Sequence, residues 1–447
     1  GAINLSKTSA AIARIIDRSK KHNQKSICFI TGVPGAGKTL AGLNIANERH
    51  NADAGEHAVF LSGNGPLVVV LQEALARNEV RDSKTSGSRI SKNKALAKTK
   101  AFIQNIHHFR DDSIQTVHPP IEKVAIFDEA QRAWTLEQTC SLIKKKKGIQ
   151  GFQMSEPDFL ISVMDRHQDY AIVICLVGGG QEINTGEAGL PEWFSAIKRN
   201  YPNWHVYVSG VLTDAEYTGG DNIYAEINPS RLHIQTDLHL SVSVRSYRSE
   251  KVSEFVRNII DNNQAIAKAL WAGIEQDYPI YLTRNIETTR NWLKEKARGS
   301  ERIGLIASSG GYRLRPYGIH VKSSIDPKNW FLNGKEDVRS SYYLEEVATE
   351  FDIQGLELDW TCVAWDADFR YSKNHWEYKN FRGSSWQNIN DPTRQKYLKN
   401  AYRVLLTRAR QGMIIFVPEG SNQDMTRKAE YYDSTYKYLS DVGLQTI

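Results

Sequence analysis

The sequence is poor in cysteine and contains no long apolar run. Its 447 residues include only four cysteines, which lie far apart and form no Cys-x-x-Cys pair: Cys28, Cys140, Cys175 and Cys362. This usage argues against a disulfide framework or a structural zinc site and favours a reducing compartment. No apolar stretch approaches the ~18 residues of a membrane span, and no signal segment opens the chain. We therefore expect a soluble, cytoplasmic protein.

Composition and charge are close to those of ordinary globular proteins. Hydrophobic residues make up 40% of the chain and charged residues 24%, which excludes a disordered or fibrous protein. The 57 Lys and Arg exceed the 51 Asp and Glu by six, a weak indication of polyanion binding that a soluble surface also explains. Residue 1 is Gly and the first Met is Met154, so we expect the natural chain to begin upstream, with an upstream domain as one option.

Short apolar runs alternate with helical patterns along the chain. The runs predict strands over 26–31, 58–62, 124–127, 171–177, 206–208, 279–282, 303–307, 361–365 and 413–417. The clearest helical patterns cover 39–47, 250–270, 288–297 and 394–410, and the polar stretches 83–100, 144–157 and 311–342 are interpreted as surface loops or small insertions. Continuous apolar strands separated by helices are typical of parallel sheets covered on both faces. We predict an α/β fold with two tandem domains, 1–237 and 238–447.

A glycine-rich segment after the first predicted strand points to nucleotide binding. Residues 32–39 read GVPGAGKT and lie between a strand and a helix, the context that a phosphate-binding loop requires. Its backbone N–H groups surround phosphates, and the following helix N-terminus favours their charge. We expect Lys38 to contact the β- and γ-phosphates and Thr39 to hold Mg²⁺. The residues expected around the nucleotide are Gly32, Pro34, Gly35, Ala36, Gly37, Lys38, Thr39 and Leu40.

Two later strand ends carry further candidates. The run 124–127 is followed by Asp128 and Glu129; in phosphate-loop NTPases an acid at this place binds Mg²⁺ and a neighbouring Glu polarises the attacking water. A pair of acids after a strand is otherwise an ordinary helix start. The sequence GGGQ over 178–181 closes another strand, where the amide of Gln181 can sense the γ-phosphate or simply face solvent in a turn.

Three segments of the second half complete an ordered set. VRS contains Arg245 after a predicted strand, QGLE precedes the strand 361–365, and LLTRAR lies on the predicted helix before 413–417. In order, GVPGAGKT, DEAQ, GGGQ, VRS, QGLE and LLTRAR resemble the superfamily 1 helicases. Four longer segments are similar in particular to the Schlafen-like group 3 DNA/RNA helicase domain family of bacteria: DEAQRAW, LSGNGPL, VGGGQEIN and AYRVLLTRARQG. The resemblance spans roughly residues 27–417.

The resemblance implies two tandem RecA-like P-loop NTPase domains that bind ATP and Mg²⁺ in the cleft between them. It implies catalytic roles for Lys38, Glu129, Gln181, Arg245 and Arg408, and metal binding by Thr39 and Asp128. Gly355 and Glu357 match the segment that links the nucleotide site to the bound strand. Lys7 stands where many members carry an adenine-reading Gln, so preference for ATP over other NTPs is left open.

The resemblance also implies a translocase or helicase that moves on single-stranded DNA or RNA. The residues expected at the strand backbone are Ser62, Asn64, Pro66, His107 and His108. The aromatic and basic stretch 369–386 suits base stacking, but core packing explains the same aromatics equally well. A nucleotide-gated switch or remodelling NTPase without unwinding activity is the alternative function, whereas a small-molecule kinase has no need of QGLE and TRAR. No motif distinguishes DNA from RNA or reports the direction of stepping.

Overall fold

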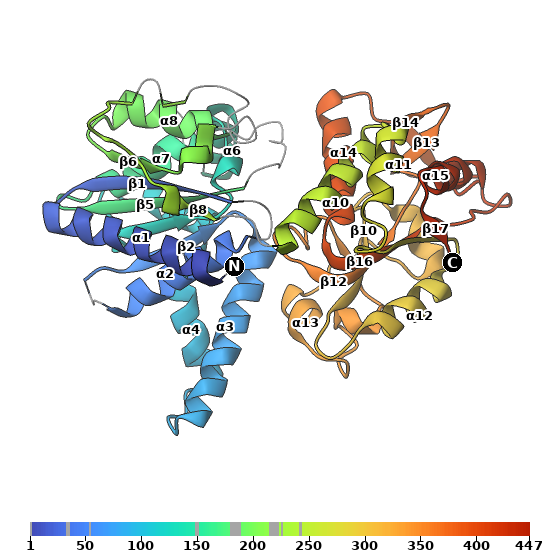
Figure 1. Ribbon diagram of the computed structural model, residues 1–447, viewed down its shortest axis with the longest axis horizontal. Helices are drawn as coiled ribbons and strands as arrows, with labels where there is room; N and C mark the ends of the chain where they lie inside the picture. The colour runs from blue at the N-terminus through green and yellow to red at the C-terminus, as the bar shows by residue number, and fades with distance from the viewer. Residues whose placement is uncertain are drawn as a thin grey trace. The chain divides into compact units, whose positions relative to one another are not determined.

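The computed structural model divides into two units, each with its own parallel sheet (Figure 1). The first unit comprises Gly1–Val68 with Leu75–Ser246, and the second comprises Val69–Ala74 with Tyr247–Ile447. The structure describes residues 2–32, 36–52, 55–147, 152–178, 189–213, 223–224, 227–240 and 244–447. Within this part of the chain, no helix combines the length and the apolar character that crossing a membrane requires.

The sheet of the first unit is parallel throughout its described strands. The strand order is β3-β2-β4-β5-β1-β6-β7, and β8 also pairs with β1. The strands are β1 Lys25–Gly32, β2 Ala58–Ser62, β3 Ile103–Asn105, β4 Val124–Phe127, β5 Ala171–Gly178, β6 His205–Val208, β7 Leu232–Ile234 and β8 His239–Leu240. Helices α1 and α2 cover one face and α6, α7 and α8 the other (Figure 1). Burial of both faces explains why these strands are continuously apolar.

The helices of the first unit include one pair that the sequence did not predict. They are α1 Ala2–His22, α2 Lys38–Ala52, α3 Gly65–Thr85, α4 Lys92–Phe102, α5 Ile106–Ile114, α6 Leu136–Lys147, α7 Glu156–Asp165 and α8 Gly189–Asn200. The expected loop over 83–100 is wrong, because α3 and α4 form a helical hairpin there. Its turn contains Gly87, which has a φ of +78°, and Ser91, whose side chain accepts from Lys94 N and caps α4. The expected loop over 144–157 is partly wrong, since α6 continues through Lys147.

The second unit also has a parallel sheet, in the order β11-β10-β12-β16-β9-β17. Its strands are β9 Ile280–Thr283, β10 Ile303–Ala307, β11 Val347–Thr349, β12 Leu358–Ala364, β16 Ala409–Phe416 and β17 Gln445–Thr446. Alternate residues of β16 enter different cores: Met413 and Ile415 join one cluster, and Ile414 and Phe416 join the other. Both faces of this sheet are therefore buried as well.

Two helix predictions in the second unit need correction. The helices are α10 Val244–Ile260, α11 Gln264–Ala272, α12 Ile286–Lys296, α13 Pro327–Leu332, α14 Pro392–Leu406 and α15 Glu430–Asp441. The single helix expected over 250–270 is broken between α10 and α11, where Asn262 has a φ of +61°. The helix expected over 394–410 ends at Leu406, so Arg408 lies in the turn before β16 rather than on a helix.

Short 3-10 helices occur in both units. They are η1 Ala130–Arg132, η2 Gly210–Thr213 and η3 Thr236–Leu238 in the first unit, and η4 Tyr312–Tyr317 and η5 Ser341–Tyr343 in the second.

The aromatic stretch of the second unit forms a small antiparallel sheet. Its strands are β13 Phe369–Ser372, β14 His375–Arg382 and β15 Ser385–Asn388. Phe369 and Trp376 are stacked with ring centroids 4.4 Å apart, and both are buried in the core. Tyr378 and Trp386 pack partly buried against the same core. Core packing therefore accounts for the aromatics at the centre of this stretch, and base stacking is not needed to explain them.

Candidate nucleotide site

Two sequence motifs of the first unit lie at the same edge of its sheet. Strand β5 lies between β1 and β4, with Gly32 opposite Gly178 and Phe127 opposite Cys175. The glycine-rich segment follows β1 and the two acids follow β4, so the two motifs begin at the carboxyl ends of the strands on either side of β5. This edge is where open α/β sheets bind their ligands.

Lys38 is the first residue of α2 and lies almost buried at the end of β1. Only 9% of the residue is exposed, and its Nζ donates a 2.6 Å hydrogen bond to the carbonyl oxygen of Gly32. Close packing of α2 holds it there: a Cβ added at Gly42 would lie 2.8 Å from Leu176 Cδ1. Gly37 has a φ of +92°, a conformation that favours glycine. Nucleotide-site residues Pro34 and Gly35 lie outside the described residues.

Thr39 and Asp128 offer two oxygen atoms to a cation. Thr39 Oγ1 donates to Asp128 Oδ1 over 3.2 Å, and Asp128 is 9% exposed. Burial, and then the negative charge of Glu129, raise the pKa of Asp128 to about 7. A bound cation would relieve both causes. In the described part of the chain, no group of three or more His, Cys, Asp or Glu is arranged to hold a metal. A magnesium ion beside a nucleotide does not need such a group, because one or two protein oxygens, the phosphates and water complete its coordination. Thr39 and Asp128 therefore fit an Mg²⁺ ion that is bound together with a nucleotide.

Glu129 is held in a fixed position by a residue to which the sequence assigned no role. Gln131, 4% exposed, donates from Nε2 to Glu129 Oε2 over 2.6 Å. Its other amide atom, Oε1, accepts from the backbone N–H of Gly178 over 3.2 Å. Gln131 therefore joins the acid-bearing turn after β4 to the end of β5. The only sequence signal for it was its place in DEAQ.

The backbone at Glu129 is strained and the turn after it is anchored. Glu129 has φ 53° and ψ 47°, in the left-handed region, which costs an L-residue ~1–2 kcal/mol. Such conformations persist where surrounding contacts enforce them, frequently at functional sites. Here the indole Nε1 of Trp193, a buried residue on α8, donates to the carbonyl oxygen of Ala130 over 2.8 Å. The turn therefore aims the Glu129 side chain independently of the strand direction.

The two segments expected at the nucleic-acid backbone lie side by side. Ser62 ends β2 and is paired with Asn105, which ends β3. Asn64 Oδ1 accepts from Leu67 N over 3.2 Å and caps α3, and Ser62 Oγ accepts from Asn64 N over 3.3 Å. Asn105 caps α5 in the same way. The side chains of Asn64 and Asn105 are therefore engaged in capping. They place a pair of helix N-termini at one sheet edge, which suits phosphate groups.

The two histidines and Pro66 differ in their position and exposure. Pro66 lies in the first turn of α3. The His107 ring packs against Trp134 with centroids 4.9 Å apart, whereas His108 is exposed. His108 is thus the more accessible of the two candidates.

The QGLE and TRAR segments of the second unit are in contact. Glu357 Oε2 and Arg410 Nε form a 2.8 Å ion pair, and the N–H of Leu358 donates to the carbonyl oxygen of Arg408 over 3.2 Å. Gly355, just before Glu357, has a φ of +76°. The guanidinium Nε of Arg408 donates to the carbonyl oxygen of Val404 over 3.1 Å, at the end of α14. Both segments precede strands, at the amino ends of β12 and β16.

Residues 25–419 match the family described as "Schlafen group 3, DNA/RNA helicase domain". The chain belongs to this family. Its α/β fold, with two tandem RecA-like units, agrees with the predicted class. No curated protein matches this helicase domain. Among solved structures it is similar to the Hef helicase domain of Pyrococcus furiosus, with 12% identity over 93% of this chain and 96% of that chain and a TM-score of 0.29.

The helicase domain brings together part of the predicted nucleotide site. Lys38, Thr39, Asp128 and Glu129 gather at the ends of β1 and β4. Leu40 lies one residue beyond Thr39 and is 52% exposed. Gln181 lies outside the described residues, as does the side chain of Arg245, whose backbone is in the first turn of α10.

Proposed function

We propose that this helicase domain hydrolyses ATP with Mg²⁺ and uses the hydrolysis to move along single-stranded DNA or RNA. The observation that supports it most is the joining of Asp128, Glu129 and Gln131 to the end of β5, beside the lysine of the phosphate loop. A buried lysine, a metal-binding pair and a positioned carboxylate are what phosphoryl transfer to water requires.

Each residue has a distinct task in this proposal. The ammonium group of Lys38 leaves the Gly32 carbonyl and neutralises charge on the β- and γ-phosphates. Thr39 and Asp128 hold Mg²⁺, which supplies charge neutralisation between the phosphates when bound. Glu129 orients the attacking water and accepts its proton, and Gln131 keeps that carboxylate aimed. The low exposure of Lys38 and Asp128 strengthens these interactions, because buried charges are screened less than charges in water.

The remaining motifs belong to both units, with Gln181 and Arg245 in the first and Arg408 in the second. We propose that Arg245 and Arg408 neutralise charge on the γ-phosphate during transfer, and that Gln181 responds to its loss. The Glu357–Arg410 ion pair links the QGLE segment to the TRAR segment, so a movement of one segment displaces the other. Ser62, Asn64, Pro66, His107 and His108 remain the proposed strand contacts, with the N-termini of α3 and α5 as the phosphate-binding feature.

The decisive experiment measures ATP hydrolysis with and without single-stranded DNA and single-stranded RNA. Stimulation by either polymer, weakened by added salt because counterions compete for phosphates, supports the proposal. A strand-displacement assay then separates a motor from a nucleotide-gated switch, which binds the strand without unwinding a duplex. Hydrolysis that neither polymer changes would contradict the coupling to nucleic acid.

A further inference from the structure

The net positive charge of the chain is concentrated in one part of the α3–α4 hairpin. Residues 77–100, here called the basic arm, contain eight Lys and Arg but only two Asp and Glu. The arm therefore carries a net charge of +6, which equals that of the whole protein. The other 423 residues contain 49 basic and 49 acidic side chains. The surplus of six basic residues is small for the whole chain, but it gives the basic arm a high local charge.

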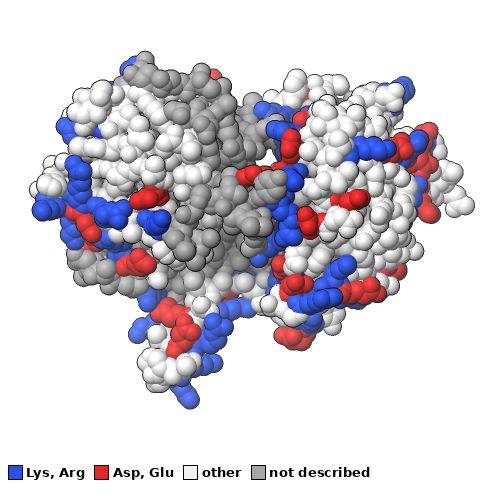
Figure 2. All heavy atoms as spheres, viewed as in Figure 1, with Lys and Arg blue, Asp and Glu red and all other residues white. Residues whose placement is uncertain are grey.

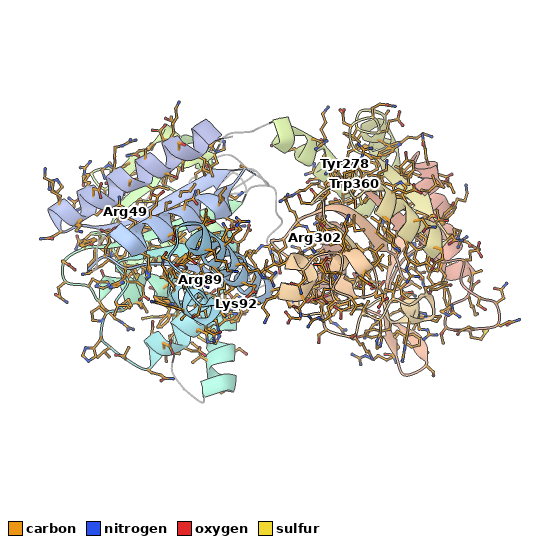
Figure 3. The ribbon with its side chains drawn as sticks, turned by 90° about the horizontal axis from the view of Figure 1, so that it is seen from below. Arg49, Arg89, Lys92, Tyr278, Arg302 and Trp360 are labelled. Carbon is orange, nitrogen blue, oxygen red and sulfur yellow. The ribbon has the colours of Figure 1, made fainter. Side chains whose placement is uncertain are left out.

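The charged groups of the arm face solvent. The α3–α4 hairpin projects away from the sheet of the first unit (Figure 1), and blue side chains follow it in Figure 2. Arg89 and Lys92 lie at its turn (Figure 3). Lys84, Arg89, Lys94 and Lys100 are exposed and form no ion pair with any carboxylate in the described part of the chain. Their charge is therefore left for an external partner.

Contacts between the two helices and across the turn define the shape of the arm. Lys98 and Glu79 tie α4 to α3 through a 2.9 Å ion pair. The hydroxyl of Ser83 donates to the carbonyl oxygen of Val80 over 2.8 Å and accepts from Ile90 N over 3.3 Å, which closes the turn. These contacts set the backbone positions from which the charged side chains of the arm extend.

We propose that the basic arm binds the phosphodiester backbone of nucleic acid, outside the strand contacts named above. This inference rests on the proposed function. A dense positive array repels itself and weakens the fold unless a polyanion compensates, and phosphodiesters carry the densest regular negative charge that such an array meets. Helix α3 begins at the sheet edge where the N-termini of α3 and α5 lie, so a strand held there can continue along the arm.

The test compares two fourfold variants with the same loss of charge. The arm variant is Lys84→Gln, Arg89→Gln, Lys94→Gln and Lys100→Gln. The control variant is Lys268→Gln, Lys294→Gln, Arg394→Gln and Lys396→Gln, all exposed in the second unit. Fluorescence anisotropy with labelled single-stranded DNA, single-stranded RNA and duplex DNA gives affinity over a series of salt concentrations. Basal ATP hydrolysis and the melting temperature are measured for every protein.

We expect the arm variant to bind at least ~10-fold more weakly at low salt and to lower the slope of log affinity against log salt by about 3, since each phosphate contact contributes nearly one unit. The control variant keeps the parental slope, and both keep basal hydrolysis and melting temperature. The polymer with the largest loss identifies the backbone that the arm prefers.

Two results would overturn the inference alone: a parental slope in the arm variant, or an equal loss in both variants, which would make the effect one of total charge. Binding of anionic lipid vesicles by the parent but not by the arm variant, with parental nucleic-acid binding in the arm variant, would overturn it in favour of a membrane. A parent that hydrolyses ATP and binds none of the three polymers refutes the proposed function itself.

Discussion

Gln131 donates a 2.6 Å hydrogen bond from its amide nitrogen to Oε2 of Glu129. Because its amide oxygen accepts from the N–H of Gly178, the orientation of the amide is determined at both ends. Arg132 also approaches Oε2, at 3.6 Å. Both contacts are made by Oε2, so in the proposed mechanism Oε1 is the oxygen that accepts a proton from water.

Replacing Gln131 tests this positioning role. Gln131→Ala removes the bridge to Gly178, so we expect kcat for ATP to fall ~10-fold, equivalent to ~1.4 kcal/mol of transition-state stabilisation, with little change in nucleotide affinity. Steady-state kinetics and a nucleotide-binding titration give the two quantities. Gln131→Glu should not restore kcat, because it places a second negative charge beside Glu129. A rise in KM with an unchanged kcat would show that Gln131 supports binding instead.

Replacing Glu129 separates binding from turnover. Glu129→Gln keeps the shape and the metal-binding pair but removes the base, so nucleotide should bind with near-parental affinity while hydrolysis stops. Lys38→Ala is the contrasting variant, since it removes the buried cation and should weaken binding as well as turnover. Titration with a fluorescent nucleotide and a phosphate-release assay measure both. Hydrolysis by Glu129→Gln at a rate comparable to the parent means that another group is the base.

Arg408 has a structural contact that competes with its proposed role. Its Nε donates to the carbonyl oxygen of Val404, as a basic residue closing a helix C-terminus does. If Arg408 also neutralises the transferring phosphoryl group, Arg408→Ala should lose at least ~10²-fold in turnover, or ~2.7 kcal/mol, and bind nucleotide normally. Arg408→Lys should rescue little, because its point charge lacks the planar fork. A lowered melting temperature with near-parental turnover per folded molecule would show that the helix contact is its whole role.

A buried carboxyl group in the second unit predicts a pH dependence of stability. Asp368 is 1% exposed and accepts hydrogen bonds from Ser308 Oγ at 2.6 Å and Tyr402 OH at 2.5 Å. Burial, and then the charge of Asp366, raise the pKa of Asp368 to about 7, against ~3.9 for an unfolded chain.

Since the folded state keeps this proton longer than the unfolded state, its stabilising effect is complete below pH ~4 and is lost as the pH rises to about 7. Over that window the free energy of unfolding should fall by up to ~1.4 kcal/mol per pH unit from this group. Urea denaturation of the parent and Asp368→Asn at several pH values measures it. The variant should show a smaller fall, and identical pH profiles would contradict the assignment.

Several elements could be predicted because their signal is local. The runs at 58–62, 124–127 and 303–307 coincide with β2, β4 and β10, since strands buried on both faces must be apolar at every position. The end of α14 was missed because LLTRAR continues a helical pattern, and nothing local shows that Arg408 O pairs with Leu358 N on a neighbouring strand. The hairpin at 83–100 was missed because its lysines and serines resemble a loop, although Ser91 is an N-cap.

By itself, the sequence determined the fold class and predicted a phosphate loop with Lys38 and Thr39 and a pair of acids after a strand, because each depends on the order of residues along one stretch of chain. Only the tertiary structure decided that β5 separates β1 from β4, which lets Gln131 join Glu129 to Gly178. It also decided that Asn64 caps a helix and that residues 77–100, with six net positive charges, form part of one helical hairpin. The physical reason is that neighbouring strands, exposed faces and hydrogen-bond partners are set by contacts between distant segments, which no local pattern records.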